Sequence, residues 1–282
     1  MEKIIQYSTT GSRFNGEWKW QAAGMCYIIV TEHRHLIVID GGSTAEDARN
    51  IIGICRTETG STKPEIDMWI LTHPHIDHIG AFAAIGENEE LRREITVKKV
   101  VFSAPDTYVF KNPARKTEKE VAMMKSAVSL LEADFYEPVS GDCLETDGVL
   151  TDILFTYRDL EKAEDPNELS MVFRISGKNK SAMFTGDSYF AGLDVVYKKH
   201  RDNGTLTELS SDIVQTAHHS LNGGHTMFYK AVGAEIALVP ISRPGDEAMN
   251  LPEENCAHHN MYARRLARTV ILAYTGTASV EI

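Results

Sequence analysis

The sequence predicts an α/β fold in which two β-sheets pack face to face and helices cover their outer faces. Short apolar runs typical of buried strands alternate with segments that have the period of amphipathic helices. Several strand-like runs end in glycine or in a cluster of polar residues. The 282 residues, 43% of them hydrophobic, suffice for one large core, and no linker divides them. We therefore expect a single domain over residues 1–282.

The first half of the chain begins with strand patterns and then alternates strands with helices. Asp40-Gly41-Gly42 ends the third strand, and the apolar residues after it recur with helical spacing. The segment after His78 has the same spacing, as does a longer amphipathic segment before residue 134. The predicted strands are 2–8, 24–31, 34–39, 66–71 and 97–103, and the predicted helices are 43–56, 79–85, 87–93 and 115–133.

The second half is predicted to contain two β-hairpins followed by alternating helices and strands. Asp147-Gly148 is a typical two-residue turn within 144–157, and residues 177–180 connect the second hairpin. The other predicted strands are 170–175, 181–184, 213–216, 236–240, 270–274 and 278–282, and the helices are 189–200, 226–232 and 259–267. This order fits two stacked sheets with helices outside.

Three histidines and one aspartate occur within six positions directly after the strand at 66–71. They are His73, His75, Asp77 and His78. Imidazole nitrogens and carboxylate oxygens are ligands shared by zinc, iron and manganese. Pro74 keeps the chain extended between the first two histidines, and a helical pattern follows the fourth residue. The cluster is therefore predicted to bind a divalent cation at the carboxyl end of a strand, where open α/β sheets bind ligands.

The spacing His73-x-His75-x-Asp77-His78 resembles the signature of the metallo-β-lactamase superfamily. Segments 38–42, 184–188 and 217–220 (VIDGG, FTGDS and AHHS) follow the order of that family's other motifs. The last two are most similar to a branch that includes the hydrolase domain of bacterial competence DNA-uptake channels and a phosphorylcholine esterase. This resemblance implies a four-layer αββα sandwich and a hydrolase with two divalent metal ions.

The resemblance also implies a role for each ligand-type residue. The roles are His73 and His75 for the first ion, Asp77 and His78 for the second, Asp187 as the bridge, and His218 as a further ligand of the second ion. Asp187 follows a strand and a glycine, which suits a carboxylate at a sheet end, although a helix N-cap is the alternative. For His218 the alternative is a turn histidine.

Two further residues are predicted to support this site. Asp40 ends a strand, and in the family such an aspartate orients the ligating histidines; an Asx-turn is the alternative. His219 is adjacent to His218 on what we expect to be an extended loop, so its imidazole should face the substrate. There it could donate a hydrogen bond to a developing negative charge or protonate a leaving oxygen. Asp77 and His219 are thus the predicted catalytic residues.

The chain departs from the family pattern at the first metal site. No histidine occurs between His78 and Asp187, so the third histidine of this site is absent. Asn167 lies in the region where it would fall and offers either an amide oxygen or a simple turn. His258 and His259 are other candidates, or else residues at the start of a helix. We expect the first ion to be bound more weakly than the second.

Composition limits the function further. A net charge of −11 argues against binding of long nucleic acid, although two bound cations would make the pocket itself positive. The four cysteines form no C-x-x-C pair, and neither a signal peptide nor a membrane span is visible, so we expect a soluble cytoplasmic protein. We predict a hydrolase of small or short phosphodiesters, with zinc as the first choice of metal and manganese or iron as alternatives. A hydrolase of carbon esters, thioesters or lactones and a non-catalytic metal-binding protein are the competing hypotheses.

Overall fold

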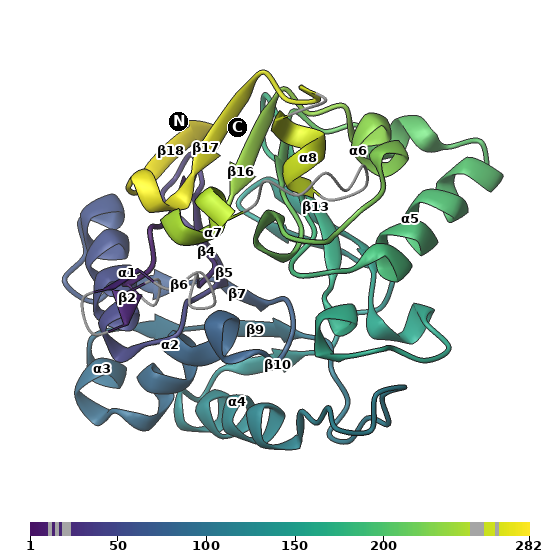
Figure 1. Cartoon of the computed structure of the whole chain (residues 1–282). Helices are drawn as coiled ribbons and strands as arrows, with labels where there is room; N and C mark the ends of the chain where they lie inside the picture. The colour runs from purple at the N-terminus through teal and green to yellow at the C-terminus, as the bar shows by residue number, and fades with distance from the viewer. Residues whose placement is uncertain (11–12, 15–16, 19–23, 249–256, 263–264) are drawn as a thin grey trace.

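The computed structural model describes residues 1–10, 13–14, 17–18, 24–248, 257–262 and 265–282. Two seven-stranded sheets form the centre of the molecule, and helices cover the outer face of each (Figure 1). The predicted α/β sandwich is confirmed. Short two-stranded pairs complete the described sheet structure: β2 (Arg13–Phe14) with β3 (Glu17–Trp18), and β6 (Glu65–Ile66) with β8 (Thr96–Val97).

The first sheet has the strand order β10-β9-β7-β5-β4-β1-β18. Its strands are β1 (Lys3–Gln6), β4 (Cys26–Val30), β5 (Leu36–Asp40), β7 (Met68–Leu71), β9 (Lys99–Phe102), β10 (Asp134–Tyr136) and β18 (Ala278–Glu281). Strands β5, β7, β9 and β10 are parallel, so their carboxyl ends lie at one edge. The helices of this half are α1 (Ala45–Thr59), α2 (Ile76–Glu87), α3 (Glu89–Arg93) and α4 (Glu118–Leu130).

The second sheet has the order β11-β12-β13-β14-β15-β16-β17. Its strands are β11 (Cys143–Thr146), β12 (Val149–Phe155), β13 (Val172–Ser176), β14 (Ser181–Phe184), β15 (Ile213–Gln215), β16 (Ile236–Val239) and β17 (Thr269–Leu272). Strands β14 to β17 are parallel to one another, whereas β13 is antiparallel to β14. The helices of this half are α5 (Phe190–Asp202), α6 (Thr226–Val232), α7 (Arg243–Ala248) and α8 (Ala257–Tyr262).

Three layers of buried side chains hold the four layers of secondary structure together. In β4, Cys26 and Ile28 face the helices of the first half, whereas Tyr27 and Ile29 face the second sheet. A third cluster joins the second sheet to its own helices, for example through Leu193 of α5. Because a strand alternates its side chains between two faces, a central strand covered on both sides is apolar throughout, as β4 is.

Capping residues explain where α1 begins and ends. Thr44 and Asp47 form a capping box, in which the Thr44 side chain accepts a hydrogen bond from the Asp47 amide. Gly60 ends the helix in the left-handed conformation with φ of +72°. The helix predicted at 43–56 is therefore present and continues three residues further, to Thr59.

Other predicted boundaries differ from the structure. The helix predicted at 115–133 spans only Glu118–Leu130, and its last three predicted residues lead into β10, which was not predicted. Strand β10 is short and largely exposed, so it lacks the apolar pattern that identifies a buried strand. Helix α7 was also not predicted. Part of the helix predicted at 259–267 lies outside the described residues.

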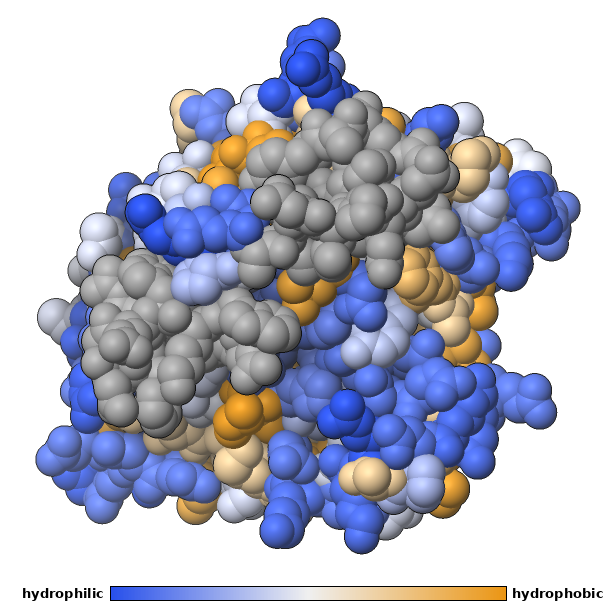
Figure 2. All heavy atoms as spheres, viewed as in Figure 1, coloured by the Kyte–Doolittle hydropathy of each residue, from blue (hydrophilic) through white to orange (hydrophobic). Residues whose placement is uncertain are grey.

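The surface seen in Figure 2 is mostly hydrophilic, with hydrophobic residues in small separate patches. Among the described residues, no helix has the length and apolar character needed to cross a bilayer.

Candidate metal centre

The first part of the candidate centre lies at the carboxyl end of β7. The strand ends shortly before His73, and α2 begins directly after His75, its N-cap residue. Asp77 and His78 consequently lie in the first turn of α2, where the helix dipole favours a carboxylate. His73 and His78 are completely buried, whereas 23% of the Asp77 side chain is exposed. The connection between strand and helix therefore brings all four residues to one edge of the first sheet.

The second part lies at the carboxyl ends of β14 and β15. Asp187 follows β14 after Gly186, which has φ of +51°. A Cβ at Gly186 would lie 3.0 Å from the Cβ atoms of Thr72 and Ser170, so glycine permits a close approach of three segments. His219 follows β15. Ligand-type side chains from both sheets thus meet at the junction of the sandwich.

These side chains form two groups, and within each group the potential ligand atoms lie within 4.8 Å of one another. The first group consists of His73, His75 and Asp187, and the second group consists of Asp77, His78, Asp187 and His219. Nε2 of His73 lies 3.0 Å from Nδ1 of His75. Oδ2 of Asp187 lies 3.2 Å from Nε2 of His78 and 3.9 Å from Nε2 of His73, so this carboxylate belongs to both groups.

The structure places His219, rather than His218, in the second group. Nε2 of His219 lies 3.1 Å from Asp77 and 3.3 Å from Asp187, and its Nδ1 lies 2.8 Å from the carbonyl oxygen of Pro240. A hydrogen on Nδ1 satisfies that carbonyl and leaves the Nε2 lone pair for a ligand. His219 therefore has the position that we predicted for His218.

The backbone explains this exchange. His218, His219 and Ser220 have φ of +47°, +50° and +67°, so the loop is a left-handed turn and not the predicted extended segment. Residues other than glycine adopt this conformation rarely and at a cost, commonly at functional sites. The turn directs the two imidazoles to different places, and the His218 ring packs 4.9 Å from the ring of Tyr189.

Asp40 contacts the second group through His78. Oδ2 of Asp40 lies 2.7 Å from Nδ1 of His78, and the carboxylate also accepts hydrogen bonds from the backbone amide and hydroxyl of Thr72. A hydrogen on Nδ1 of His78 leaves Nε2 free to bind an ion. Asp40 has φ of +54°, a conformation that aspartate and asparagine tolerate better than most residues. The carboxylate of Asp40 is therefore in direct contact with His78, one of the residues of the second group.

The charged residues of the second group shift one another's pKa values. Burial lowers the pKa of His219, but Asp187 and Asp77 outweigh it and raise that pKa to about 10. Burial likewise opposes protonation of His78, yet the charges of Asp187, Asp40 and Asp77 raise its pKa well above the usual value. Burial alone would raise the pKa of Asp187, but His219 and His78 lower it strongly. The carboxylates are thus ionised, and protons occupy positions that a cation would take.

Unpaired buried atoms test whether this cluster suits a metal. Oδ1 of Asp187, Oδ1 of Asn167 and Nε2 of His78 are buried and make no hydrogen bond. Buried polar atoms are nearly always paired, so three such atoms close to two sets of ligand-type residues need a partner. Oxygen and nitrogen lone pairs in this number suit a divalent cation. The residues present therefore fit a dinuclear centre.

The structure also identifies hydrogen-bond partners of the candidate site residues, of which Tyr189 was not singled out from the sequence. Tyr189 accepts a hydrogen bond of 2.7 Å from the Asn167 amide, and Asn222 accepts one from Nδ1 of His218. Ser170 accepts a hydrogen bond from the backbone amide of Asp187. No spacing rule links these residues, because they come from separate loops that only the fold brings together.

Among the described residues, His225 belongs to neither of the two metal-type groups. Nε2 of His225 forms an ion pair of 3.2 Å with Asp194. His258 and His259 lie in α8, and the placement of their side chains lies outside what the structure describes.

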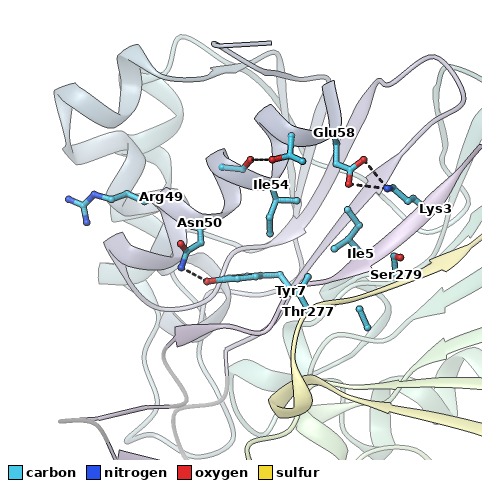
Figure 3. Close-up of a pocket in the computed structure, with 12 residues that line it drawn as sticks. Lys3, Ile5, Tyr7, Arg49, Asn50, Ile54, Glu58, Thr277 and Ser279 are labelled. Atoms are coloured by element: carbon cyan, nitrogen blue, oxygen red, sulfur yellow. Dashed lines mark hydrogen bonds and ion pairs between the residues drawn. The ribbon is translucent and has the colours of Figure 1, made fainter. Parts of the chain in front are cut away.

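A separate groove of about 520 Å³ runs between β1, β18 and α1 (Figure 3). Within it Lys3 pairs with Glu58, and Asn50 donates a hydrogen bond to the hydroxyl of Tyr7. None of the residues of the two metal-type groups lines this groove. The candidate centre is therefore a distinct site.

The sequence pattern of the metallo-beta-lactamase superfamily matches residues 21–224, which is most of the chain. The chain belongs to this superfamily. A search of curated protein sequences finds no match. Members of the superfamily typically hold a dinuclear metal site, and the two groups around Asp187 correspond to such a site. The particular branch suggested by the Thr-Gly-Asp and double-histidine segments is not established by this match.

Solved structures support the fold assignment. The metallo-beta-lactamase fold protein YhfI from Bacillus subtilis is 14% identical, with each chain covered fully and a TM-score of 0.57. Zinc-bound PqqB from Methylobacterium extorquens is 9% identical, with full coverage of both chains and a TM-score of 0.55. The diiron β-hydroxylase CmlA from Streptomyces venezuelae is 13% identical, with a TM-score of 0.55 over 99% of this chain and 54% of its own. At these identities the likeness shows the fold alone.

Proposed function

We propose that the protein is a metal-dependent hydrolase of phosphodiester bonds that uses a dinuclear centre. The first group would hold one ion and the second group the other, with Asp187 as the shared ligand. The observation that carries this proposal is the membership of Asp187 in both groups. Two divalent ions bound in this way would supply a water of lowered pKa and would hold a phosphoryl oxygen.

The protein's own residues would divide the remaining tasks. Asp40 would orient His78, and the Pro240 carbonyl would orient His219, so that each imidazole presents Nε2. Asp77 is the one carboxylate of the second group with appreciable exposure, and its pKa is lowered chiefly by His78 and His219 in spite of burial. The lowered pKa keeps Asp77 ionised, and its exposure makes it accessible to a substrate. We therefore assign it as a proton acceptor in hydrolysis in addition to its place among the residues that would hold the second ion. The predicted catalytic role of His219 changes to that of a ligand.

The substrate preference follows from charge. A phosphoryl centre spreads negative charge over several oxygens, which two cations and nearby hydrogen-bond donors stabilise together. The net charge of −11 disfavours long nucleic acid, so small or terminal diesters are the expected substrates. Zinc is our first choice of metal, with manganese and iron as alternatives.

Parallel assays test this proposal. Bis-p-nitrophenyl phosphate, a lactone and a cephalosporin should be offered to protein loaded with zinc, manganese or iron, with His219→Ala as the inactive control. We expect turnover of the diester and its loss in the control. Turnover of the lactone or the cephalosporin without turnover of the diester would favour a hydrolase of carbon esters instead.

A further inference from the structure

We propose that the side-chain oxygen of Asn167 is the protein ligand that completes the first group, and that His218 is the positioning residue that orients it. This inference rests on the proposed dinuclear centre and adds the identity of one ligand. It also predicts that the first position binds its ion more weakly than the second position does.

The backbone holds Asn167 close to the first group. Asn167 lies in the short 3-10 helix Pro166–Leu169, in which its amide donates a hydrogen bond of 2.9 Å to the Asp165 side chain. Directly after this helix, Ser170 accepts a hydrogen bond of 3.0 Å from the Asp187 amide. The next residue, Met171, donates its amide to the carbonyl of Thr72, at 3.0 Å. The segment is therefore attached both to Asp187 and to the residue that precedes His73.

Two neighbouring acceptors determine the orientation of the side-chain carboxamide of Asn167. Its nitrogen donates to the hydroxyl of Tyr189 at 2.7 Å and lies 3.4 Å from Nε2 of His218. Asn222 accepts the hydrogen on Nδ1 of His218, so Nε2 of that imidazole carries a lone pair. The opposite orientation of the amide would place its oxygen against this lone pair, which is repulsive. His218 and Tyr189 thus hold the amide nitrogen and turn the oxygen away from themselves.

The oxygen that results has no partner. Asn167 is 5% exposed, and its Oδ1 is buried without a hydrogen bond. A buried carbonyl oxygen without a donor is costly, and a cation removes that cost. The first group supplies two imidazoles and one shared carboxylate, so an ion bound there would take its next ligand from water or from a further side chain. Asn167 therefore offers a free acceptor on a segment whose backbone and Ser170 side chain contact Thr72 and Asp187.

An amide oxygen is expected to hold an ion less strongly than a carboxylate does. It is a neutral, hard ligand, which suits manganese or magnesium better than it suits zinc. The second group has two carboxylates, whereas the first has only the shared one. We therefore expect the first position to bind its ion more weakly than the second position does.

Metal titration of the whole protein tests the assignment without any substrate. The metal-free protein is titrated with Mn²⁺ and, separately, with Co²⁺, and stoichiometry, affinity and the Co²⁺ absorption spectrum are recorded. The wild type should bind two ions in two steps. The tight step would correspond to the second group and the weak step to the first group. Asn167→Ala should weaken the weak step about tenfold to a hundredfold and leave the tight step unchanged. Asn167→Asp should strengthen the weak step, because a carboxylate replaces a neutral oxygen.

A positioning role for His218 has its own readout. His218→Ala should weaken the same step, and Asn167→Asp should rescue it in the double variant, because a carboxylate offers oxygen in either orientation. Asn203→Ala, an exposed asparagine at the end of α5, is the matched control and should not alter either step. Retention of the tight step shows that each variant is folded, since that step needs residues from both sheets.

Three results would overturn the assignment. Two unchanged steps in Asn167→Ala would exclude Asn167 as a ligand and leave the hydrolase proposal intact. A weak step that Asn167→Asp does not strengthen would do the same. A wild-type protein that binds no ion in either step would refute both proposals together.

Discussion

Oδ2 of Asp40 lies 2.7 Å from Nδ1 of His78, and neither side chain has any exposed surface. Asp40 ends β5, and His78 lies in the first turn of α2, so this contact links two elements of the first half directly behind the candidate centre. The hydrogen bond determines which nitrogen of His78 faces the centre. The first prediction follows from this relationship.

Asp40→Asn should lower metal affinity at the second group by about ten- to a hundredfold. Asparagine tolerates the positive φ of this position and can still accept a hydrogen bond from Thr72, so the fold is preserved. Its amide hydrogens, however, would face Nδ1 of His78 and move the imidazole hydrogen to Nε2, where it blocks the ion. Metal titration checks this, with Asp134→Asn, on an exposed position of β10, as the control. Unchanged affinity would show that Asp40 does not orient the ligand.

Asp187→Ala should abolish binding of both ions and reduce hydrolysis by orders of magnitude, because both groups lose their shared carboxylate. Metal content after gel filtration and turnover of a diester are the measurements. The circular dichroism spectrum should be retained. If metal content and turnover both survive the substitution, Asp187 does not bridge the two sites.

Metal binding should release protons at neutral pH. The pKa of His219 is raised to about 10 and that of His78 is also raised, so in the metal-free protein an entering ion displaces their protons. Affinity should consequently rise with pH beyond neutrality and fall as the solution is acidified. Calorimetric titration in buffers of different ionisation enthalpy measures the released protons. Binding at pH 7.5 that has the same enthalpy in every buffer would contradict the prediction.

The raised pKa of His219 also contributes to the pH dependence of the free energy of unfolding of the metal-free protein. A group whose pKa is higher in the folded state stabilises the fold fully below its unfolded value, which is 6.5 for histidine. This contribution from His219 should be lost progressively as pH rises from about 6.5 to 10. Urea unfolding of the metal-free protein across this range checks the sign, and His219→Gln should show a smaller loss of stability over the same range because His78 alone still contributes.

Two glycines should respond oppositely to alanine. Gly86 in α2 is packed so closely against Ala127 of α4 that an added Cβ would overlap it, and we expect Gly86→Ala to destabilise by about 1–3 kcal/mol. Gly53 lies in α1 with nothing within 4 Å of an added Cβ. Gly53→Ala should stabilise by about 0.5–1 kcal/mol because alanine favours the helix. Urea unfolding of both variants gives the two values, and equal signs would contradict this account.

Much of the architecture was predictable because its signals are local. The hairpin turn Asp147-Gly148 and the apolar runs of the parallel strands identify elements within a few residues, and the structure contains them. Strand β10 escaped prediction because its residues are mostly exposed and its neighbour in the sheet is β9, which lies beyond a whole helix. Pairing at that distance leaves no periodic pattern in the strand itself.

The residue types of the candidate site were predictable from the sequence, but the directions in which their side chains point were not. His73, His75, Asp77 and His78 are adjacent in sequence, and their ligand chemistry is visible there. Which imidazole of His218 and His219 faces Asp187 depends on three consecutive residues with positive φ. Residues other than glycine rarely adopt that conformation, and although histidine does so more often than most, three such residues in succession require the surrounding fold to impose it. The orientation of Asn167 likewise depends on Tyr189 and His218, which are distant in sequence.

The meeting of ligand-type residues from both sheets determines when a newly made chain can acquire its ions. His219 follows His78 by 141 residues, and at about 5–20 residues per second the ribosome needs roughly 7–30 s to synthesise that interval. During this time the histidine-rich segment lacks His219, and until residue 187 has been made it lacks Asp187 as well. Loading of the proposed centre is therefore a late event that follows docking of the second sheet, and an ion taken up earlier would bind in a different coordination.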